Sequence, residues 1–240
     1  MSLIGRLFGR SVQLSPAQTR RLEAWRRLEE PDLASARLHP RYVVVDVESS
    51  GLDVHHDRLI AIGAAAVFDS GIVLADSFYA VLRQDRVSSD DNILVHGIGG
   101  SVQTGASDPR EVLLQFLEYA GKSPLVGFHS PFDEIMIDRA MRRYLGERFR
   151  RSWLDLAWLA PSLLEAQAGF GRNHHRKGLD DWLHDFGIVN ISRHHAFADA
   201  LATAQLLQVL LHHAAMQAPR TVNDLIEAAD SQRLLDRQRR

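Results

Sequence analysis

Apolar residues in the first half of the chain occur in runs that have the length of β-strands. Residues 42–47 form a β-rich run without polar alternation, which predicts a strand buried on both faces. Leu59–Phe68 and residues 77–82 predict two further strands, joined through turn-forming residues at 69–71. Three successive strands with short links indicate an antiparallel meander.

The second half of the chain alternates helical patterns with short apolar runs. Asp108 and Pro109 open a predicted helix that closes at Gly121, and 125–126 and 152–156 are predicted short strands. Further helices are predicted over 132–145, 157–164, 178–186, 196–213 and from 222 into the tail. The pattern predicts an α/β fold, with a mixed sheet flanked by helices.

Both ends of the chain differ from this central pattern. Residues 17–30 are strongly helix-forming, and Ser15 before Pro16 is typical of a helix start. We therefore expect a helical extension over 1–40, a central domain over 41–215 and a helical tail over 216–240.

The composition excludes some kinds of site chemistry but says little about binding partners. The 240 residues include no cysteine, which excludes disulfides and thiolate metal sites. No run of 18 apolar residues is present, so we expect a cytoplasmic protein without a membrane partner. A net charge of −2 argues neither for nor against nucleic acid, because an acidic metal site can coexist with basic rims.

Two acids stand at the end of the first predicted strand. Asp46 and Glu48 lie two residues apart, so their side chains face the same side of the strand. Carboxylates in apolar surroundings are costly to desolvate unless something compensates, and a divalent cation would do so. Oxygen ligands of this kind suit Mg²⁺ or Mn²⁺. Taken alone, however, such a pair is more often a solvated strand end.

Two later positions add acids and a histidine. Asp133 follows the apolar run 125–127 and opens a predicted helix, where an acid also complements the helix dipole. His194 precedes the 196–213 helix, and Asp199 lies in the first turns of that helix on an Ala-rich segment. Each feature alone also fits a solvated helix face or a polar loop.

Together these residues resemble the three motifs of the DEDDh exonucleases: D-x-E on a first strand, F-D at a middle helix start and H-x-A-x-x-D at a late helix. The resemblance covers roughly residues 42–213 and is greatest to the proofreading branch similar to the epsilon subunit of DNA polymerase III. Supporting matches lie at 95–98, 152–156 and 178–180. The resemblance implies a ribonuclease-H-like mixed sheet.

The resemblance also implies an activity and its site. It implies a 3′→5′ exonuclease that releases nucleoside monophosphates, with two divalent cations, Mg²⁺ or Mn²⁺, held by Asp46, Glu48, Asp133 and Asp199. His194 is the implied general base, and the expected role of His195 is local packing or a contact at the rim of the site. The implied substrate-binding residues surround the 3′-terminal nucleotide; they are Ser49, Ser50, Gly51, Leu52, His96, Phe128 and His129.

Some positions depart from the family pattern. Ser49 and Ser50 replace the usual two Thr and keep the hydroxyls, whereas Phe128 and His129 occupy the usual His-Asn positions. Phe128 fits a stacking role and a core role equally well. Residues 169–177 are basic and rich in glycine, and we expect a mobile loop near the site. His174 and His175 within it lack a third spaced ligand, which argues against zinc.

Three functions stay open at this stage. The leading one is a DNA exonuclease acting on 3′ ends, expected on single-stranded DNA, with a DNA polymerase or a sliding clamp as a candidate partner. The second is an RNA-processing exoribonuclease of the same fold. The third is a non-catalytic module that binds nucleic acid or a polymerase, against which the intact acids and His194 argue. Residues 13–16 are similar to a clamp-binding peptide, but a helix cap explains them better.

Overall fold

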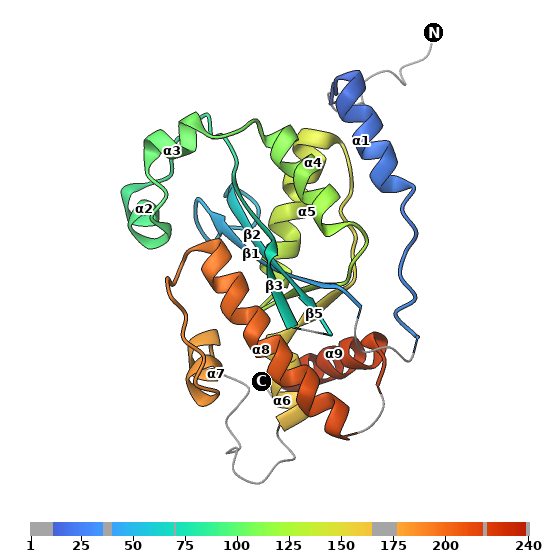
Figure 1. Cartoon of the computed structure of the whole chain (residues 1–240). Coiled ribbons are helices and arrows are strands. Elements are labelled where there is room, and N and C mark those ends of the chain that lie inside the picture. The colour runs from blue at the N-terminus through green and yellow to red at the C-terminus, as the bar shows by residue number, and fades with distance from the viewer. Residues whose placement is uncertain (1–11, 36–39, 70, 165–176, 218–219, 239–240) are drawn as a thin grey trace.

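The computed structural model shows one mixed sheet between two layers of helices (Figure 1). The structure describes residues 12–35, 40–69, 71–164, 177–217 and 220–238. The strands follow the order β3-β2-β1-β4-β5 across the sheet. Their bounds are β1 Tyr42–Ser49, β2 Leu59–Phe68, β3 Gly71–Val81, β4 Leu125–Gly127 and β5 Trp153–Asp155.

The first three strands pair antiparallel, and β4 and β5 continue the sheet in parallel. The predicted meander and mixed sheet are therefore confirmed. The prediction for the third strand was too short, because β3 begins at Gly71 and not at residue 77. Residues 72–75 are apolar, but the polar residues at 76 and 77 interrupt the run, and the prediction began the strand only at this interruption. In the structure, residues 71–77 of this edge strand are exposed or half-buried.

The helices cover both faces of the sheet. Their bounds are α1 Pro16–Arg26, α2 Asp90–His96, α3 Gly100–Gly105, α4 Pro109–Ala120, α5 Pro131–Leu145, α6 Leu156–Leu164, α7 Leu179–Asp185, α8 Ala196–Gln217 and α9 Val222–Gln238. The sequence patterns predicted all of these except α2 and α3, which at seven and six residues are too short for a 3.6-residue period to be seen. No helix in the described part of the chain is long and apolar enough to span a bilayer.

Strand β1 is buried on both faces because its side chains alternate between two cores. Tyr42 and Val44 pack with residues of α6, α7, α8 and α9, whereas Val43, Val45 and Val47 pack with residues of α1, α4 and α5. This alternation places Asp46 and Glu48 on the α8 face of the sheet. The register of β1 shifts between Glu48 and Ser49, where the strand leaves the sheet.

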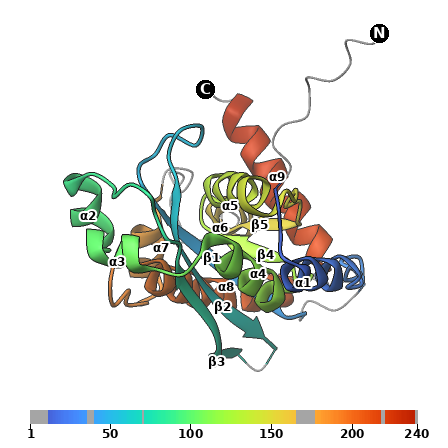
Figure 2. The ribbon, with the colours of Figure 1, turned by 90° about the horizontal axis from the view of Figure 1, so that it is seen from above.

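Both terminal helices pack on the central part of the chain. Helix α1 begins with a capping box between Ser15 and Gln18 and contacts α4, where Arg21 bridges to Glu111 at 2.6 Å. Helix α9 packs on α6 and reaches β5. Figure 2 shows α1 beside α4 in the view from above. The division into an extension, a central domain and a tail stays a prediction.

Candidate active site

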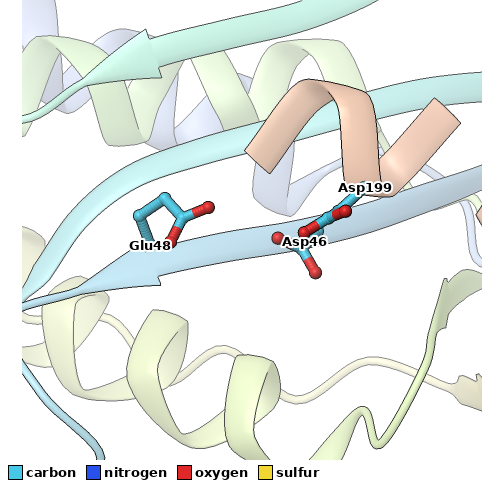
Figure 3. A group of neighbouring side chains, drawn as sticks. All are labelled: Asp46, Glu48 and Asp199. Atoms are coloured by element: carbon cyan, nitrogen blue, oxygen red, sulfur yellow. The ribbon is translucent and has the colours of Figure 1, made fainter. Parts of the chain in front are cut away.

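Three carboxylates meet at the end of the central strand. One oxygen each of Asp46, Glu48 and Asp199 lies within 4.8 Å of the others. Asp46 and Glu48 come from β1, and Asp199 comes from the first turn of α8 (Figure 3). Asp199 is 3% exposed and Glu48 is 8% exposed, so the cluster lies within the fold and not on its surface.

The close approach of α8 depends on a residue without a side chain. Gly63 of β2 pairs with Asp46 across the sheet. A Cβ atom at position 63 would lie 2.2 Å from the carbonyl carbon of Ala196 and from the backbone nitrogen of Phe197. The backbone of α8 therefore occupies the space that a side chain would need, and this contact brings Asp199 to β1.

Asp133 reaches the same strand from the opposite layer. It lies in the first turn of α5, is 6% exposed, and accepts a hydrogen bond from the backbone N–H of Val47, between Asp46 and Glu48. The charge of Asp133 acts on both of these carboxyls. The structure thus brings all four predicted acids to one end of β1, although Asp133 lies outside the group of three within 4.8 Å.

Burial and mutual repulsion make this site costly without a cation. Burial raises the pKa of Asp46 well above its usual value, and the charges of Asp133, Asp199 and Glu48 raise it further. Burial, then Asp199 and Asp133, raises the pKa of Glu48 to about 8. Burial likewise raises the pKa of Asp133. Divalent cations would remove this repulsion, and four carboxylates offer the oxygen ligands that such cations prefer, so the residues fit a metal centre.

Asp199 also has partners that the sequence analysis did not identify. Arg193 lies 2.6 Å from its Oδ1 and 2.8 Å from Asp180, and Asn190 donates a side-chain hydrogen bond to the same Oδ1. The positive charge of Arg193 lowers the pKa of both Asp46 and Glu48. Its position directly before His194 was the available signal, but the direction of its side chain depends on the loop conformation.

His194 lies in the loop that leads into α8. Its backbone has a φ of 58°, an uncommon left-handed conformation for a residue other than glycine, and its backbone N–H donates to Oδ2 of Asp199 at 3.0 Å. The side chain is exposed. The strained backbone is held by the same carboxylate that belongs to the acidic cluster, which keeps His194 beside that cluster.

The neighbouring His195 has a different environment. Its ring stacks on Tyr79, with ring centres 4.7 Å apart and planes at 21°. Its Nδ1 accepts the backbone N–H of Ala198, and its carbonyl accepts the N–H of Asp199, so it caps the start of α8. These contacts fit the local packing role that the sequence predicted for His195.

In the loop after β1, the hydroxyls of Ser49 and Ser50, which were predicted to bind substrate, form hydrogen bonds within the loop. Ser49 donates to the carbonyl of Gly51 at 2.6 Å, and Ser50 donates to Asp57 at 2.8 Å. A Cβ at Gly51 would meet the Asp57 carboxylate at 2.4 Å, so this position requires glycine. Leu52 is 88% exposed at the tip. The loop therefore presents Leu52 and backbone groups outward, while both hydroxyls are engaged within it.

His96 is buried, and both of its ring nitrogens have partners. Nδ1 accepts the backbone N–H of Ile98 at 3.0 Å, and Nε2 lies 3.3 Å from the Ser88 hydroxyl. His96 lines a hollow of about 380 Å³ together with His194 and His195. Only contacts through its ring surface are therefore open to a nucleotide without rearrangement.

Phe128 and His129 lie between β4 and α5. Phe128 is half-buried against the core on the α8 side of the sheet, and it meets the His129 ring edge-on at 5.0 Å. His129 is exposed, has a φ of 60°, and donates its backbone N–H to Asp155 at 2.9 Å. The Asp155 side chain thus shapes the turn that starts α5. The predicted loop at 169–177, including His174 and His175, lies outside the described residues except for Lys177.

Comparison with known proteins identifies relatives of the same type. The RNase T family model, described as an exonuclease, matches residues 43–207. The PolC-type DNA polymerase III of Thermotoga petrophila is 28% identical over 165 residues, which are 69% of this chain and 11% of that polymerase. The DNA polymerase III subunit epsilon of Aquifex aeolicus is 25% identical over 170 residues, which are 71% of this chain and 80% of that subunit.

A solved structure has the same fold. E. coli exonuclease I, crystallised in complex with a dT13 oligonucleotide, has a TM-score of 0.61 at 16% identity, over 73% of this chain and 42% of that chain. The chain corresponds to only a small part of the PolC-type polymerases that it matches. The predicted resemblance to exonucleases of the epsilon-like branch is confirmed. Because the family model covers most of the chain and encloses the acidic cluster, the chain belongs to the RNase T family of exonucleases.

Proposed function

We propose that this chain is a metal-dependent exonuclease that removes nucleoside monophosphates from the 3′ end of DNA. The observation that supports this most directly is the set of carboxylates at the end of β1. In three of them, one oxygen each lies within 4.8 Å of the others. A strand end that only served the fold would not concentrate carboxyls whose pKa values burial and mutual repulsion raise. Such groups instead suit a cation-dependent phosphodiester hydrolysis.

Asp46, Glu48, Asp133 and Asp199 would hold the cations. When bound, divalent cations would supply positive charge that stabilises the attacking and the leaving oxygen of the phosphodiester. Asp46 is central in this assignment, because all three other carboxyls act on it. Arg193 contacts Oδ1 of Asp199, so it supplies positive charge at a carboxylate that would hold a cation.

His194 would accept the proton of the attacking water as the phosphorus–oxygen bond to the leaving 3′ oxygen breaks. General bases of this kind contribute roughly 10²–10⁴-fold to a rate. The exposed ring and the link between the His194 backbone and Asp199 are consistent with this role. Leu52, exposed at the tip of the loop after β1, would contact the terminal base, with Phe128, His129 and the ring surface of His96 around the terminal nucleotide.

The DNA substrate is favoured by the relatives. The epsilon and PolC relatives are named as parts of DNA polymerase III, and exonuclease I was crystallised with the oligonucleotide dT13. RNA remains the second candidate, because discrimination depends on contacts to the 2′-hydroxyl. A polymerase or clamp partner, the cytoplasmic location and the choice of Mg²⁺ or Mn²⁺ are part of the same proposal. A non-catalytic nucleic-acid-binding module is the alternative that activity would exclude.

The decisive experiment follows 5′-labelled oligonucleotides of DNA and RNA over time. A 3′→5′ exonuclease should convert the DNA into a descending ladder and release mononucleotides, whereas a closed circular single strand should resist it. EDTA should stop the reaction, and Mg²⁺ or Mn²⁺ should restore it. Asp46→Asn should abolish hydrolysis while the circular dichroism spectrum stays that of the wild type. Full activity in excess chelator would refute the metal-dependent mechanism.

A further inference from the structure

Helix α9 forms one wall of a hollow next to the acidic cluster. The hollow has a volume of about 350 Å³ and is lined by Arg233 and Arg237 from α9, with Trp158, Pro131 and His129 on the facing elements. The exonuclease family match ends at residue 207, so α9 lies beyond it. The hollow therefore combines family elements with a helix that the family domain does not include.

The hollow adjoins the catalytic end of α5. Pro131 is the first residue of α5, and Asp133 follows two residues later in the same turn. Arg233 lines the same hollow as Pro131, so it lies beside the first turn of α5, which carries Asp133.

The two arginines of α9 are available for a ligand. They lie four residues apart, so they project from the same side of the helix. Within the described ranges, neither guanidinium forms a hydrogen bond or an ion pair, Arg233 is half-buried and Arg237 is exposed. Asp236 lies on the same rim and has a partner of its own.

Asp155 also borders the hollow but lies beneath its surface. It is 9% exposed, and its Oδ1 accepts the backbone N–H groups of His129 and Ala157. Apart from Asp155, the charged residues that line the hollow are the half-buried Arg233 and Asp236 and the exposed Arg237, so positive charge exceeds negative charge there, which favours an anion over a cation. Trp158 is half-buried at the same place and offers an aromatic surface.

We propose that Arg233 and Arg237 of α9 bind the phosphates of the nucleic acid strand that leads to the scissile bond. The inference rests on the proposed function, because it takes a nucleic acid as the substrate. Guanidinium groups bind phosphate oxygens through two parallel hydrogen bonds, and bases of single strands stack on aromatic side chains such as Trp158. Helix α9 is then an accessory substrate-binding element, which positions the strand without touching the reacting atoms.

The test measures binding as a function of salt. The double variant Arg233→Gln/Arg237→Gln is prepared in the inactive Asp46→Asn background, and its binding to a 5′-fluorescein-labelled dT15 is followed by anisotropy with Mg²⁺ present. Each lost phosphate contact of a single strand should reduce the slope of log K against log salt by about 0.7, so the double variant should lose about 1.4. In the active background, the KM for dT15 should rise by roughly 10-fold while kcat changes by less than about 2-fold.

Two further variants distinguish phosphate binding from a structural effect. Arg233→Lys/Arg237→Lys keeps both charges and should retain most of the salt slope. Arg20→Gln/Arg27→Gln, within α1 and at its C-cap, removes the same net charge from exposed arginines and should leave both slope and KM unchanged. If the wild type binds dT15 and the α9 glutamine variant has the same salt slope as the wild type, the role of α9 is wrong, whereas the proposed function is unaffected.

A small substrate separates this inference from the proposed function. The 4-nitrophenyl ester of thymidine 5′-monophosphate contains the scissile bond but no upstream phosphate. If the wild type hydrolyses neither this ester nor dT15 and does not bind dT15, the proposed function fails and the role of α9 fails with it. If the wild type hydrolyses both, the salt slope of the α9 variant decides the inference.

Discussion

Gly63→Ala should reduce activity although residue 63 carries no reactive group. The added Cβ would lie 2.2 Å from two backbone atoms of α8 and 2.4 Å from the carbonyl oxygen of Ala196. Ordinary contacts of a Cβ lie at 3.4–4 Å. All three opposing atoms belong to the backbone, so a change of side-chain rotamer cannot relieve the overlap. Helix α8 must retreat or tilt, by about 1.2 Å if it is to restore the shortest ordinary contact.

The displacement would act directly on the catalytic geometry. Ala196 and Phe197 lie between His194 and Asp199 in the chain. When α8 retreats, His194 and Asp199 therefore move away from Asp46 and Glu48. A misplacement of about 1 Å can lower a catalysed rate by about 10²-fold. Overpacking of this kind also costs about 1–3 kcal/mol of stability. We therefore expect a folded protein with a rate reduced by about 10²-fold and a weaker response to Mn²⁺.

The assay compares initial rates on 5′-labelled single-stranded DNA over a range of Mn²⁺ concentrations, together with thermal unfolding. Gly105→Ala is the matched control, because a Cβ at Gly105 would have no atom within 4 Å. It should retain wild-type rates and stability. If Gly63→Ala has the wild-type rate, Mn²⁺ dependence and melting temperature, the explanation of how α8 is brought to β1 is wrong.

Three further changes probe the charges around the site. In metal-free protein, the pKa of Glu48 lies at about 8 against an ordinary value of 4.5, so the folded state binds this proton more tightly than the unfolded state does. The stability that protonated Glu48 contributes is then fully present below about pH 4.5 and is lost as the pH rises through about 8. Urea unfolding in EDTA should therefore show that the free energy of unfolding falls by roughly 1–3 kcal/mol over this pH range. In Glu48→Gln this pH dependence should largely disappear. His194→Ala should lower kcat by roughly 10²-fold at saturating Mn²⁺, whereas His195→Ala should have a much smaller effect on kcat; the opposite order would shift the assignment of the base by one residue. Arg193→Gln should lower the melting temperature in EDTA but not in saturating Mg²⁺, because the guanidinium offsets the acidic charges only while cations are absent; equal destabilisation under both conditions would contradict this role.

Elements with a strong apolar pattern were predictable from the chain alone. The strands β1 and β2 and the helices α4, α5 and α8 each bury a continuous set of apolar side chains, and the sequence shows that set directly. The start of β3 was missed although residues 72–75 are apolar, because Asp76 and Ser77 interrupt the apolar pattern and only the pairing with β2 shows one continuous strand. Helices α2 and α3 were not predicted, because they are too short for a helical pattern of apolar residues to repeat.

In the candidate site, too, some features were predictable from local sequence and others were not. Spacing within each motif showed Asp46, Glu48, Asp133, His194 and Asp199 as candidates, because a two-residue repeat on a strand and a helix start are local properties of the chain. Only the combination of the three motifs, which resembles that of the DEDDh exonucleases, made a shared site the expectation. The roles expected for Ser49 and Ser50 depended on side-chain direction. In the folded chain both hydroxyls hold the loop that contains them, which no local pattern indicated.

By itself, the sequence determined most of the segments that form the sheet and the family that the chain resembles, and through that resemblance it indicated the residues that are proposed to bind cations. Tertiary structure alone decided that Gly63 admits the backbone of α8, that Arg193 pairs with Asp199, and that Arg233 lies beside the first turn of α5. The physical reason is that these contacts join segments far apart in the chain. Their distances depend on how whole helices pack against the sheet, and packing is a property of the complete set of buried side chains.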